Sequence, residues 1–514
     1  MFLLQLDLLQ TKLAGSRPRR SNCDHLDKAV MKLVKILRQT RRLALILFVI
    51  GAIAQTLNAQ TTEPQRDELL NGLRVLLWNK PGDQTVILKL RIHSGAAFDT
   101  AGKAGTMALL GDLLFPDAAT HDYFTGEMAG RLDVETDYDS IEITLQGRAN
   151  EYDRIVDILR GALVTTPLTP ENLAKVRETR IKKLSEKKPT AGEIADQAIA
   201  GRVLGDFPYT HPVGGTVESL TRIERPDVML ARDRFLSPNN ATLSIVGGVD
   251  QRRAMRTLRQ LLGGWRKSDQ IVPATFRQPD PPDKRTLILN STGLPLAEVR
   301  LGTRGIARAD RDFFAASLLT VLARERWRQL AQAPSGTTFF AKADAHVLPE
   351  MFVLGATVDS TAALKSLETA VAAIKSLVNT PASPAELQLA KGQSFGFANQ
   401  GTDTTAWLDI DTFRLPPISE QQRSINALSA ADLQRVAKRL FNDNSIASVI
   451  VGNVEQLKAG SAAGKMQLVT NSTPYQSKPS EPSASTGSNT ESKTPAPASI
   501  APPLKNGSTA IVPD

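Results

Sequence analysis

The hydrophobic and polar positions of the chain follow two different periods. Three short segments are rich in β-branched residues and partly alternate between apolar and polar positions, which is typical of strands. These segments are residues 74–78, 85–92 and 140–147. Residues 151–164 instead place their apolar side chains on one stripe at helical spacing, which predicts an amphipathic helix.

A second helix is predicted directly after this one. Thr169 is a favourable N-cap residue and Pro170 a favourable first residue, so we expect a helix from Pro170 to about residue 188. Strand groups followed by helices indicate an α+β fold, in which helices pack on one face of a mostly antiparallel sheet.

The same signals occur twice along the chain. Residues 239–251 resemble residues 443–456, and residues 167–173 resemble residues 381–387, at offsets of 205 and 214 positions. The period is too long and the copies are too few for a solenoid. We therefore expect two homologous α+β domains. The expected segments are an N-terminal domain at 65–268, a linker rich in Pro and Asp at 269–284, and a C-terminal domain at 285–458.

Several segments, in order, resemble the pitrilysin/insulinase-type zinc metallopeptidases. The matching stretches are residues 71–82, 102–115, 205–223, 235–250 and 294–316, and the resemblance covers about residues 65–458. It implies a pitrilysin/insulinase-like fold in which two domains face each other around a peptide chamber.

The resemblance also implies an inverted zinc motif, H-x-x-E-H, on the helix at 102–115. Residues i, i+3 and i+4 share one helix face, so two imidazoles bind zinc while the carboxylate activates water. The matching positions here are Ala108, Gly111 and Asp112. The family's third ligand, a glutamate, matches Lys183, with Lys182 or Glu186 as alternative registers. We therefore expect no bound zinc and a degenerate, non-catalytic site.

A charge pair is the proposed replacement for the metal. If the register holds, Asp112 and Lys183 face each other, and the lysine ammonium takes the place of the zinc charge. The alternative is that Lys183 points to solvent and Asp112 is a half-exposed polar residue at a cleft rim. Gly111 lowers helix propensity by about 1 kcal/mol relative to alanine, which a position without a catalytic role tolerates.

The histidines do not suggest another metal site. Four lie outside the N-terminal leader, and no two of them have helical ligand spacing. His93 is expected in a strand, His121 in a loop and His211 in a turn; with His346, each is interpreted as structural. No G-x-S-x-G elbow is present, although a Ser-His-Asp triad remains open because its members need not be close in sequence.

In the family, the second domain supplies an Arg and a Tyr that hold the substrate. The matching residues are Gln332, or Ala331 with a one-residue shift, and Phe339. Both substrate-binding positions are therefore degenerate. The simpler interpretation of Trp327, Phe339 and Phe340 is core packing.

Net charge excludes a nucleic-acid-binding role. The 514 residues carry a net charge of +9, but residues 1–59 hold ten Lys and Arg against three Asp and Glu. The remainder holds 52 basic and 50 acidic residues, too balanced for a polyanion-binding surface. Cys23 is the sole cysteine, so the exported chain needs no disulfides.

Residues 1–59 resemble an export leader. Basic residues precede the apolar run 43–54, and Ala59 is a small residue suited to cleavage, so we expect a signal peptide and a periplasmic location. Twelve apolar residues fall short of the roughly 20 that span a bilayer, but an uncleaved leader that anchors the chain is the alternative. Met31 is a candidate for the true start.

The C-terminal stretch, residues 459–514, is expected to be a disordered tail. In residues 471–514, 22 of 44 residues are Pro, Ser or Thr, a composition that buries too little apolar surface to fold.

Three functions remain open. The first is an exported non-catalytic subunit that completes a peptide-binding chamber with a zinc-bearing homologue, or with a second copy of itself. The second is an active metalloendopeptidase with an unusual metal site. The third is a standalone peptide-binding or scaffold protein. Only the first requires a partner, and only the second requires a metal.

Overall fold

The computed structural model describes two halves of the chain. The described residues are 63–165, 168–269, 276–277, 279–291, 295–332, 336–394, 404–442, 446–459 and 468–471. The expectations for the leader, including Cys23 and Met31, lie outside these residues, as do those for most of the tail.

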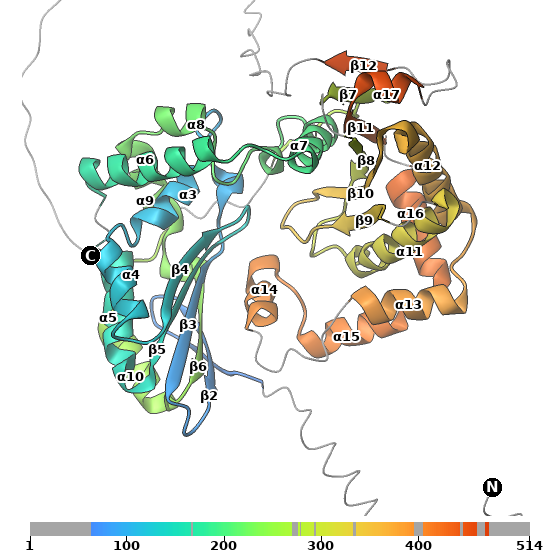
Figure 1. Ribbon diagram of the computed structural model, residues 1–514. Helices are drawn as coiled ribbons and strands as arrows, with labels where there is room; N and C mark the ends of the chain where they lie inside the picture. The colour runs from blue at the N-terminus through green and yellow to red at the C-terminus, as the bar shows by residue number, and fades with distance from the viewer. Residues whose placement is uncertain are drawn as a thin grey trace, which may run out of the picture. The chain divides into compact units, whose positions relative to one another are not determined.

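The first half is built on a six-stranded sheet in the order β1-β2-β6-β3-β5-β4 (Figure 1). Its strands are β1 (Gln65–Glu68), β2 (Arg74–Asn79), β3 (Thr85–Ile92), β4 (Arg131–Thr136), β5 (Ile141–Arg148) and β6 (Ala241–Gly247). All neighbouring strands are antiparallel except β2 and β6, which run parallel. The sheet is therefore mostly antiparallel, as expected.

Helices cover one face of this sheet and close the first hydrophobic core, to which α3, α5, α9 and α10 contribute buried side chains. The helices of the first half are α3 (Thr106–Leu113), α4 (Ala118–Thr125), α5 (Tyr152–Val164), α6 (Pro170–Glu186), α7 (Ala191–Leu204), α8 (Val217–Arg222), α9 (Arg225–Phe235) and α10 (Gln251–Leu262). Short 3₁₀ turns lie at Ala96–Phe98 (η1), Ala149–Glu151 (η2), Pro208–Thr210 (η3) and Pro238–Asn240 (η4). The predicted cap is present, because the Thr169 side chain accepts a hydrogen bond from the Asn172 N–H.

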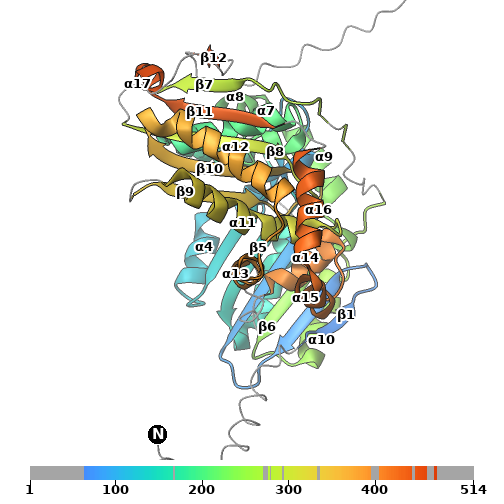
Figure 2. The same cartoon turned by 90° about the vertical axis from the view of Figure 1, so that its right-hand side faces the viewer.

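The second half repeats this plan with a sheet in the order β12-β7-β11-β8-β10-β9 (Figure 2). Its strands are β7 (Thr286–Asn290), β8 (Leu296–Arg304), β9 (Thr338–Ala343), β10 (Met351–Asp359), β11 (Ala447–Gly452) and β12 (Leu468–Asn471). Its helices are α11 (Phe313–Ala331), α12 (Ala363–Asn379), α13 (Pro384–Ser394), α14 (Thr405–Phe413), α15 (Ile418–Ala427), α16 (Ala430–Phe441) and α17 (Val454–Ala459), with the 3₁₀ turn η5 (Ser360–Ala362).

Strand order shows that the two halves are copies. In both sheets a central strand from late in the half, β6 or β11, runs parallel to one neighbour and antiparallel to the other, as β6 does with β2 and β3, and β11 with β7 and β8. The α+β fold class of two homologous domains is thus confirmed. The two sheets differ at one edge. In the first sheet the edge strand β1 runs antiparallel to β2, whereas in the second sheet the edge strand β12 runs parallel to β7. β12 also lies within 459–514, so these four residues of the expected disordered tail are ordered by pairing with β7.

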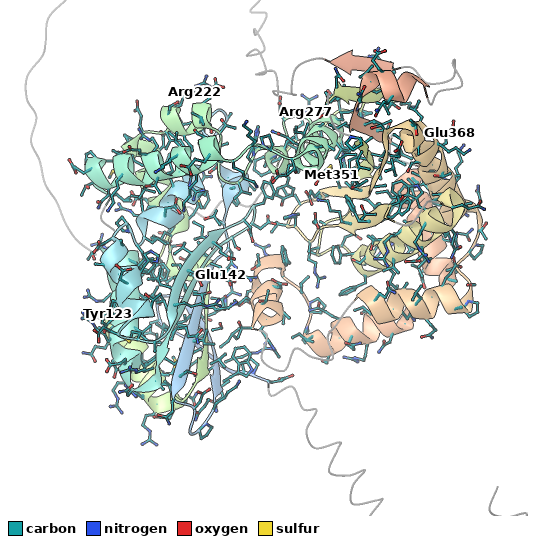
Figure 3. All side chains as sticks on the ribbon, viewed as in Figure 1. Tyr123, Glu142, Arg222, Arg277, Met351 and Glu368 are labelled. Atoms are coloured by element: carbon teal, nitrogen blue, oxygen red, sulfur yellow. The ribbon has the colours of Figure 1, made fainter. Side chains whose placement is uncertain are left out.

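One helix of the first half covers the second sheet. α7 packs on β8 and β11, and its side chains share a buried cluster with Met351 and Val449 (Met351 is labelled in Figure 3). Gly302 on β8 permits this approach, because a Cβ there would lie 2.9 Å from Ile199 Cγ1. The second sheet is therefore covered on both faces, which the sequence pattern does not predict.

One helix of the second half makes the reciprocal contact with the first sheet. Trp407 of α14 meets Trp78 of β2 edge-to-face, with ring centroids 6.0 Å apart. Asp409 pairs with Arg91 at 2.6 Å, and Asp411 pairs with Arg74. Each half thus contributes one helix to the contact between them. Within the described residues, no helix is long and apolar enough to cross a bilayer.

We predict that Ile199→Ala lowers the free energy of unfolding by about 2–4 kcal/mol, because it opens a cavity where α7 meets β8. Urea unfolding followed by circular dichroism measures the change. Leu230→Ala on α9 is the matched control, since Leu230 is exposed and its truncation removes little buried surface. Equal small effects for both variants would contradict the role of α7 as a core element.

Candidate functional site

The helix that matches the family's zinc helix is intact and buried. In α3 every residue except Asp112 is buried. The carboxylate of Asp99 fixes the start of this helix by accepting hydrogen bonds from the Gly105 N–H at 2.6 Å and the Met107 N–H at 2.8 Å. Burial raises the pKa of Asp99 to about 7. The sequence pattern did not single out Asp99, because its partners lie six and eight residues away in a loop and a helix.

An arginine from α6 lies across the two positions that match the zinc histidines. Arg180 donates to Asp112 Oδ2 from Nε at 2.9 Å and from Nη2 at 2.6 Å. Its Nη2 also lies 3.5 Å from the Ala108 carbonyl oxygen, one turn earlier in α3. A single guanidinium therefore spans the segment of α3 where the family carries its metal ligands.

This pairing corrects the predicted partner of Asp112. A charge pair between α3 and α6 is present, but its cation is Arg180 and not Lys183. Among the described residues, Lys183 makes no ion pair within 4 Å, although it lines the same cavity. The buried side chains Leu173 and Val176 define the inward stripe of α6, and Arg180 continues it one turn further on. The expected pair with Asp112 is therefore made by a residue about one helical turn before Lys183.

Gly111 has a packing role that the sequence did not reveal. A Cβ at this position would lie 2.9 Å from Thr136 Oγ1 and 3.4 Å from Val134 Cγ1, both on β4. The absence of a side chain lets α3 lie close to β4. A larger side chain at this position would therefore require the Thr136 side chain to move.

A cavity of about 500 Å³ opens beside the Asp112–Arg180 pair. Its floor is apolar, with Phe115, Leu132 and Leu184, and its polar wall includes His121 and Lys183. β4, which supplies Leu132, is the edge strand of the first sheet. The site therefore combines a free strand edge with a partly apolar cavity.

The residues of this site do not fit a zinc ion. Catalytic zinc sites use three protein ligands from His, Glu, Asp or Cys, whereas here Arg180 pairs with Asp112, and the other acid of the cavity, Asp133, pairs with Arg131 at 3.3 Å. A search of the described residues finds no group of three or more His, Cys, Asp or Glu placed to hold a metal ion. We therefore derive no metal-dependent step.

Three histidines have structural or unassigned positions. His93 follows the end of β3 and is half-buried, with ring nitrogens 3.0 Å from the hydroxyls of Thr242 and Thr412. Burial, reinforced by Arg74 and Arg91, lowers the pKa of His93 to about 3, so the ring is neutral. His121 lies in helix α4 and not in a loop as expected, because Asp117 caps that helix. His211 ends the turn η3.

His346 belongs to a buried charged cluster that joins the two halves. Its Nδ1 lies 2.7 Å from Asp139 Oδ2, and its Nε2 lies 3.3 Å from Glu350 Oε2. Tyr209 donates to the other Asp139 oxygen at 2.8 Å and stacks on the imidazole, with centroids 4.7 Å apart. Burial disfavours the charged ring, but the carboxylates of Asp139 and Glu350 outweigh it and raise the pKa of His346 to about 10.

The expected substrate-holding positions lie at the end of α11 and on β9. Gln332 is exposed and ends α11 with a φ of 44°. Phe339 packs edge-to-face on the fully buried Trp327, with centroids 4.9 Å apart. Phe340 covers Gly355, where a Cβ would lie 2.0 Å from the ring. Core packing explains the three aromatic residues, and a substrate role for Gln332 and Phe339 stays a prediction.

Comparisons with known proteins agree with this fold and site. The family model described as "Peptidase M16 inactive domain" matches residues 222–394. An uncharacterized zinc protease of Rickettsia felis is 20% identical over 242 residues, which is 44% of this chain and 58% of the relative. The beta subunit of the mitochondrial-processing peptidase of Neurospora crassa is 21% identical over 421 residues, covering 76% of this chain and 88% of the relative.

Solved structures share the same fold at low sequence identity. A peptidase M16 inactive domain from Pseudomonas fluorescens aligns with a TM-score of 0.67 and 16% identity, covering 76% of this chain and 98% of that structure. The first half of the periplasmic protease PqqL from Escherichia coli aligns with a TM-score of 0.64 and 14% identity, covering 78% and 94%. At these identities the structural likeness establishes the fold alone.

The fold is a two-domain α+β arrangement similar to that of M16 peptidase structures, and the ion pair includes Asp112, one of the positions that match the family's zinc motif in sequence. Residues 222–394 match the family of M16 inactive domains, and both halves of the chain are similar in fold to pitrilysin/insulinase-type (M16) peptidases.

We predict that Asp112 and Arg180 are energetically coupled by about 1 kcal/mol, since two N–H groups of Arg180 donate to one oxygen of Asp112 and both side chains are partly buried. A double-mutant cycle on Asp112→Ala and Arg180→Ala, read as the free energy of unfolding, measures the coupling. The matched cycle of Asp112→Ala with Lys183→Ala should be additive. Coupling to Lys183 with none to Arg180 would reverse the assignment.

We predict that the charged His346 cluster stabilises the fold below about pH 6.5 and loses this effect as pH rises toward 10. The sign follows because folding raises the pKa of His346 from its ordinary value of 6.5 to about 10. The stability difference between wild type and His346→Gln should therefore shrink by up to about 1.4 kcal/mol per pH unit between these values. Chemical unfolding at pH 6, 7, 8, 9 and 10 measures it.

His211→Gln is the control for this series, because no ion pair of His211 occurs among the described residues. Its difference from wild type is measured at the same pH values as a baseline for the loss of an imidazole elsewhere in the chain. A pH-independent difference for His346→Gln would show that the ring of His346 is not charged in the folded protein.

Proposed function

We propose that the chain is an exported, non-catalytic subunit that completes a peptide-binding chamber together with a zinc-bearing homologue. The observation that carries the proposal is the Asp112–Arg180 pair on an otherwise preserved zinc helix. A guanidinium stays protonated at neutral pH and cannot ligate a metal. The chain thus keeps the fold of a peptidase but lacks the residues that bind the catalytic metal. Such a chain suits a complex in which another chain supplies the catalysis.

A free strand edge supports a peptide-binding role. β4 has a hydrogen-bonded neighbour on one side only, β5, so its other edge presents backbone N–H and C=O groups. An extended peptide can add to such an edge, with its side chains entering an adjacent cavity. The cavity beside Asp112 and Arg180 contains Leu132 and Val134 of β4 and meets that requirement.

The names of relatives support partnership and export. The Neurospora crassa relative is described as a subunit of a processing peptidase, and the Escherichia coli structure as a periplasmic protease. Export of this chain rests on the leader sequence, with a signal peptide within residues 1–59. An uncleaved leader would keep the same protein at the outer face of the inner membrane.

We predict that the full-length chain, affinity-tagged at its C-terminus and purified from its native host, brings down a homologue that carries H-x-x-E-H. The purified pair should hydrolyse an unstructured peptide, and the chain alone should not, because its site holds no metal ligands. Mass spectrometry identifies the partner, and peptide cleavage before and after separation measures the dependence.

The control is a homologue purified from a strain that lacks this chain, whose activity should fall. Recovery of the chain alone, together with unchanged hydrolysis in the deletion strain, would overturn the partner role and leave a standalone peptide-binding protein. Hydrolysis by the isolated chain that a chelator abolishes would instead identify an active enzyme with an unusual metal site.

A further inference from the structure

A second cavity, of about 530 Å³, lies wholly within the second half of the chain. Its walls come from α11, α14 and α15, from the end of β9, and from Arg308 before α11. None of these elements contributes to the cavity beside α3 and α6. The volume falls within the roughly 300–1,000 Å³ typical of small-ligand sites.

Arg308 is a buried cation in this cavity without a matching anion. The residue is only 8% exposed, and its guanidinium lies 4.7 Å and 4.9 Å from the ring centroids of Phe313 and Phe314. Its Nη2 donates to Gln421 Oε1 at 2.8 Å. Among the described residues, no carboxylate comes within 4 Å of Arg308. Four of its five side-chain N–H donors are thus available to hydrogen-bond a ligand.

The charge state of Arg308 is compatible with the binding of an anion. Burial lowers its pKa to about 10, partly offset by the more distant Asp409. The side chain is still protonated at neutral pH. A buried charge is costly unless it is paired, and the two aromatic faces leave only the planar edge of the guanidinium for a partner. A carboxylate matches that edge with two parallel hydrogen bonds.

The same cavity also carries negative charge near Arg308. Asp344 lines it, is 47% exposed, and meets Lys342 only at 3.7 Å. The two segments are close along the backbone, because the Arg308 N–H donates to the carbonyl oxygen of His346 at 2.8 Å. Asp409, which pairs with Arg91, is a second acid in the wall. Arg324 and Lys342 line the cavity as well, so charges of both signs face it, and a ligand with both an anionic and a cationic group matches them better than a phosphate dianion does.

We propose that this cavity binds a small zwitterion, a free amino acid or short peptide, with its α-carboxylate on Arg308 and its ammonium group toward Asp344. Ser317 and Thr320 of α11 provide hydroxyl groups along the wall between the charged ends. The proposal does not depend on the function of the α3–α6 site, since it uses different residues and needs neither metal nor partner.

Calorimetric titration of the full chain with trialanine tests the proposal. We expect saturable binding of trialanine, binding at least about tenfold weaker for its C-terminal amide, and weaker binding for its N-acetyl form, because each change removes one of the two matched charges. Inorganic phosphate should not compete. Equal binding of the amide, tighter binding of phosphate, or no binding of trialanine would each overturn the proposal.

Two variants separate the site from general folding effects. Arg308→Lys keeps the charge but loses the planar fork and should weaken trialanine binding about tenfold. Thr320→Trp leaves Arg308 intact and fills the cavity, so it should abolish binding even if Arg308→Lys folds poorly. Arg311→Gln is the matched control, since Arg311 is exposed and outside this cavity. Unchanged binding in Thr320→Trp would place the ligand elsewhere.

Discussion

The ion pair between Asp112 and Arg180 is the constraint on which the interpretation of this protein depends. It joins α3 and α6 at the point where the family uses a metal. A partly exposed pair contributes only about 1 kcal/mol, whereas burial of a single leucine such as Leu109 contributes about 1.5–3 kcal/mol. Apolar packing therefore holds α3 in place, and the ion pair neutralises the charge that the site retains.

Charge also decides how the two halves meet. The inner face of the first sheet carries Arg74 and Arg91, and α14 brings two aspartates onto it. The second sheet carries the buried Arg300, and α7 brings Asp196 to it at 2.6 Å. Burial opposes the charge on Arg91, but Glu142 and Asp409 raise its pKa overall. Removing one member of such a buried pair strands the other, so these pairs specify the docking more than they add stability.

Local patterns in the sequence predicted the repeated unit well. Three strands (β2, β3 and β5), the helix at 151–164 and the capped helix from Pro170 were expected within one or two residues of their observed bounds, because period and caps are local properties. The duplication and the loss of the zinc motif at Ala108, Gly111 and Asp112 also followed from the sequence.

The same local patterns could not predict the contacts between residues that lie far apart in the sequence. Arg180 and Lys183 lie within one turn of α6, and only the packing angle on α3 decides which of them meets Asp112. The pattern of α7 shows an apolar helix but not that its apolar side faces the sheet of the other half. Similarly, Arg308 looks like an ordinary surface arginine until α11, α14 and α15 enclose it.

The central claim is that an ion pair has replaced the metal. Thermal unfolding of the purified chain, after chelation and again with one equivalent of zinc, tests it most directly when combined with elemental analysis. The account predicts no stoichiometric zinc and the same unfolding midpoint in both samples, because zinc that binds only the folded state would raise the midpoint. About one zinc per chain, with a midpoint that falls on chelation and a loss of the metal in Asp112→Ala, would contradict it.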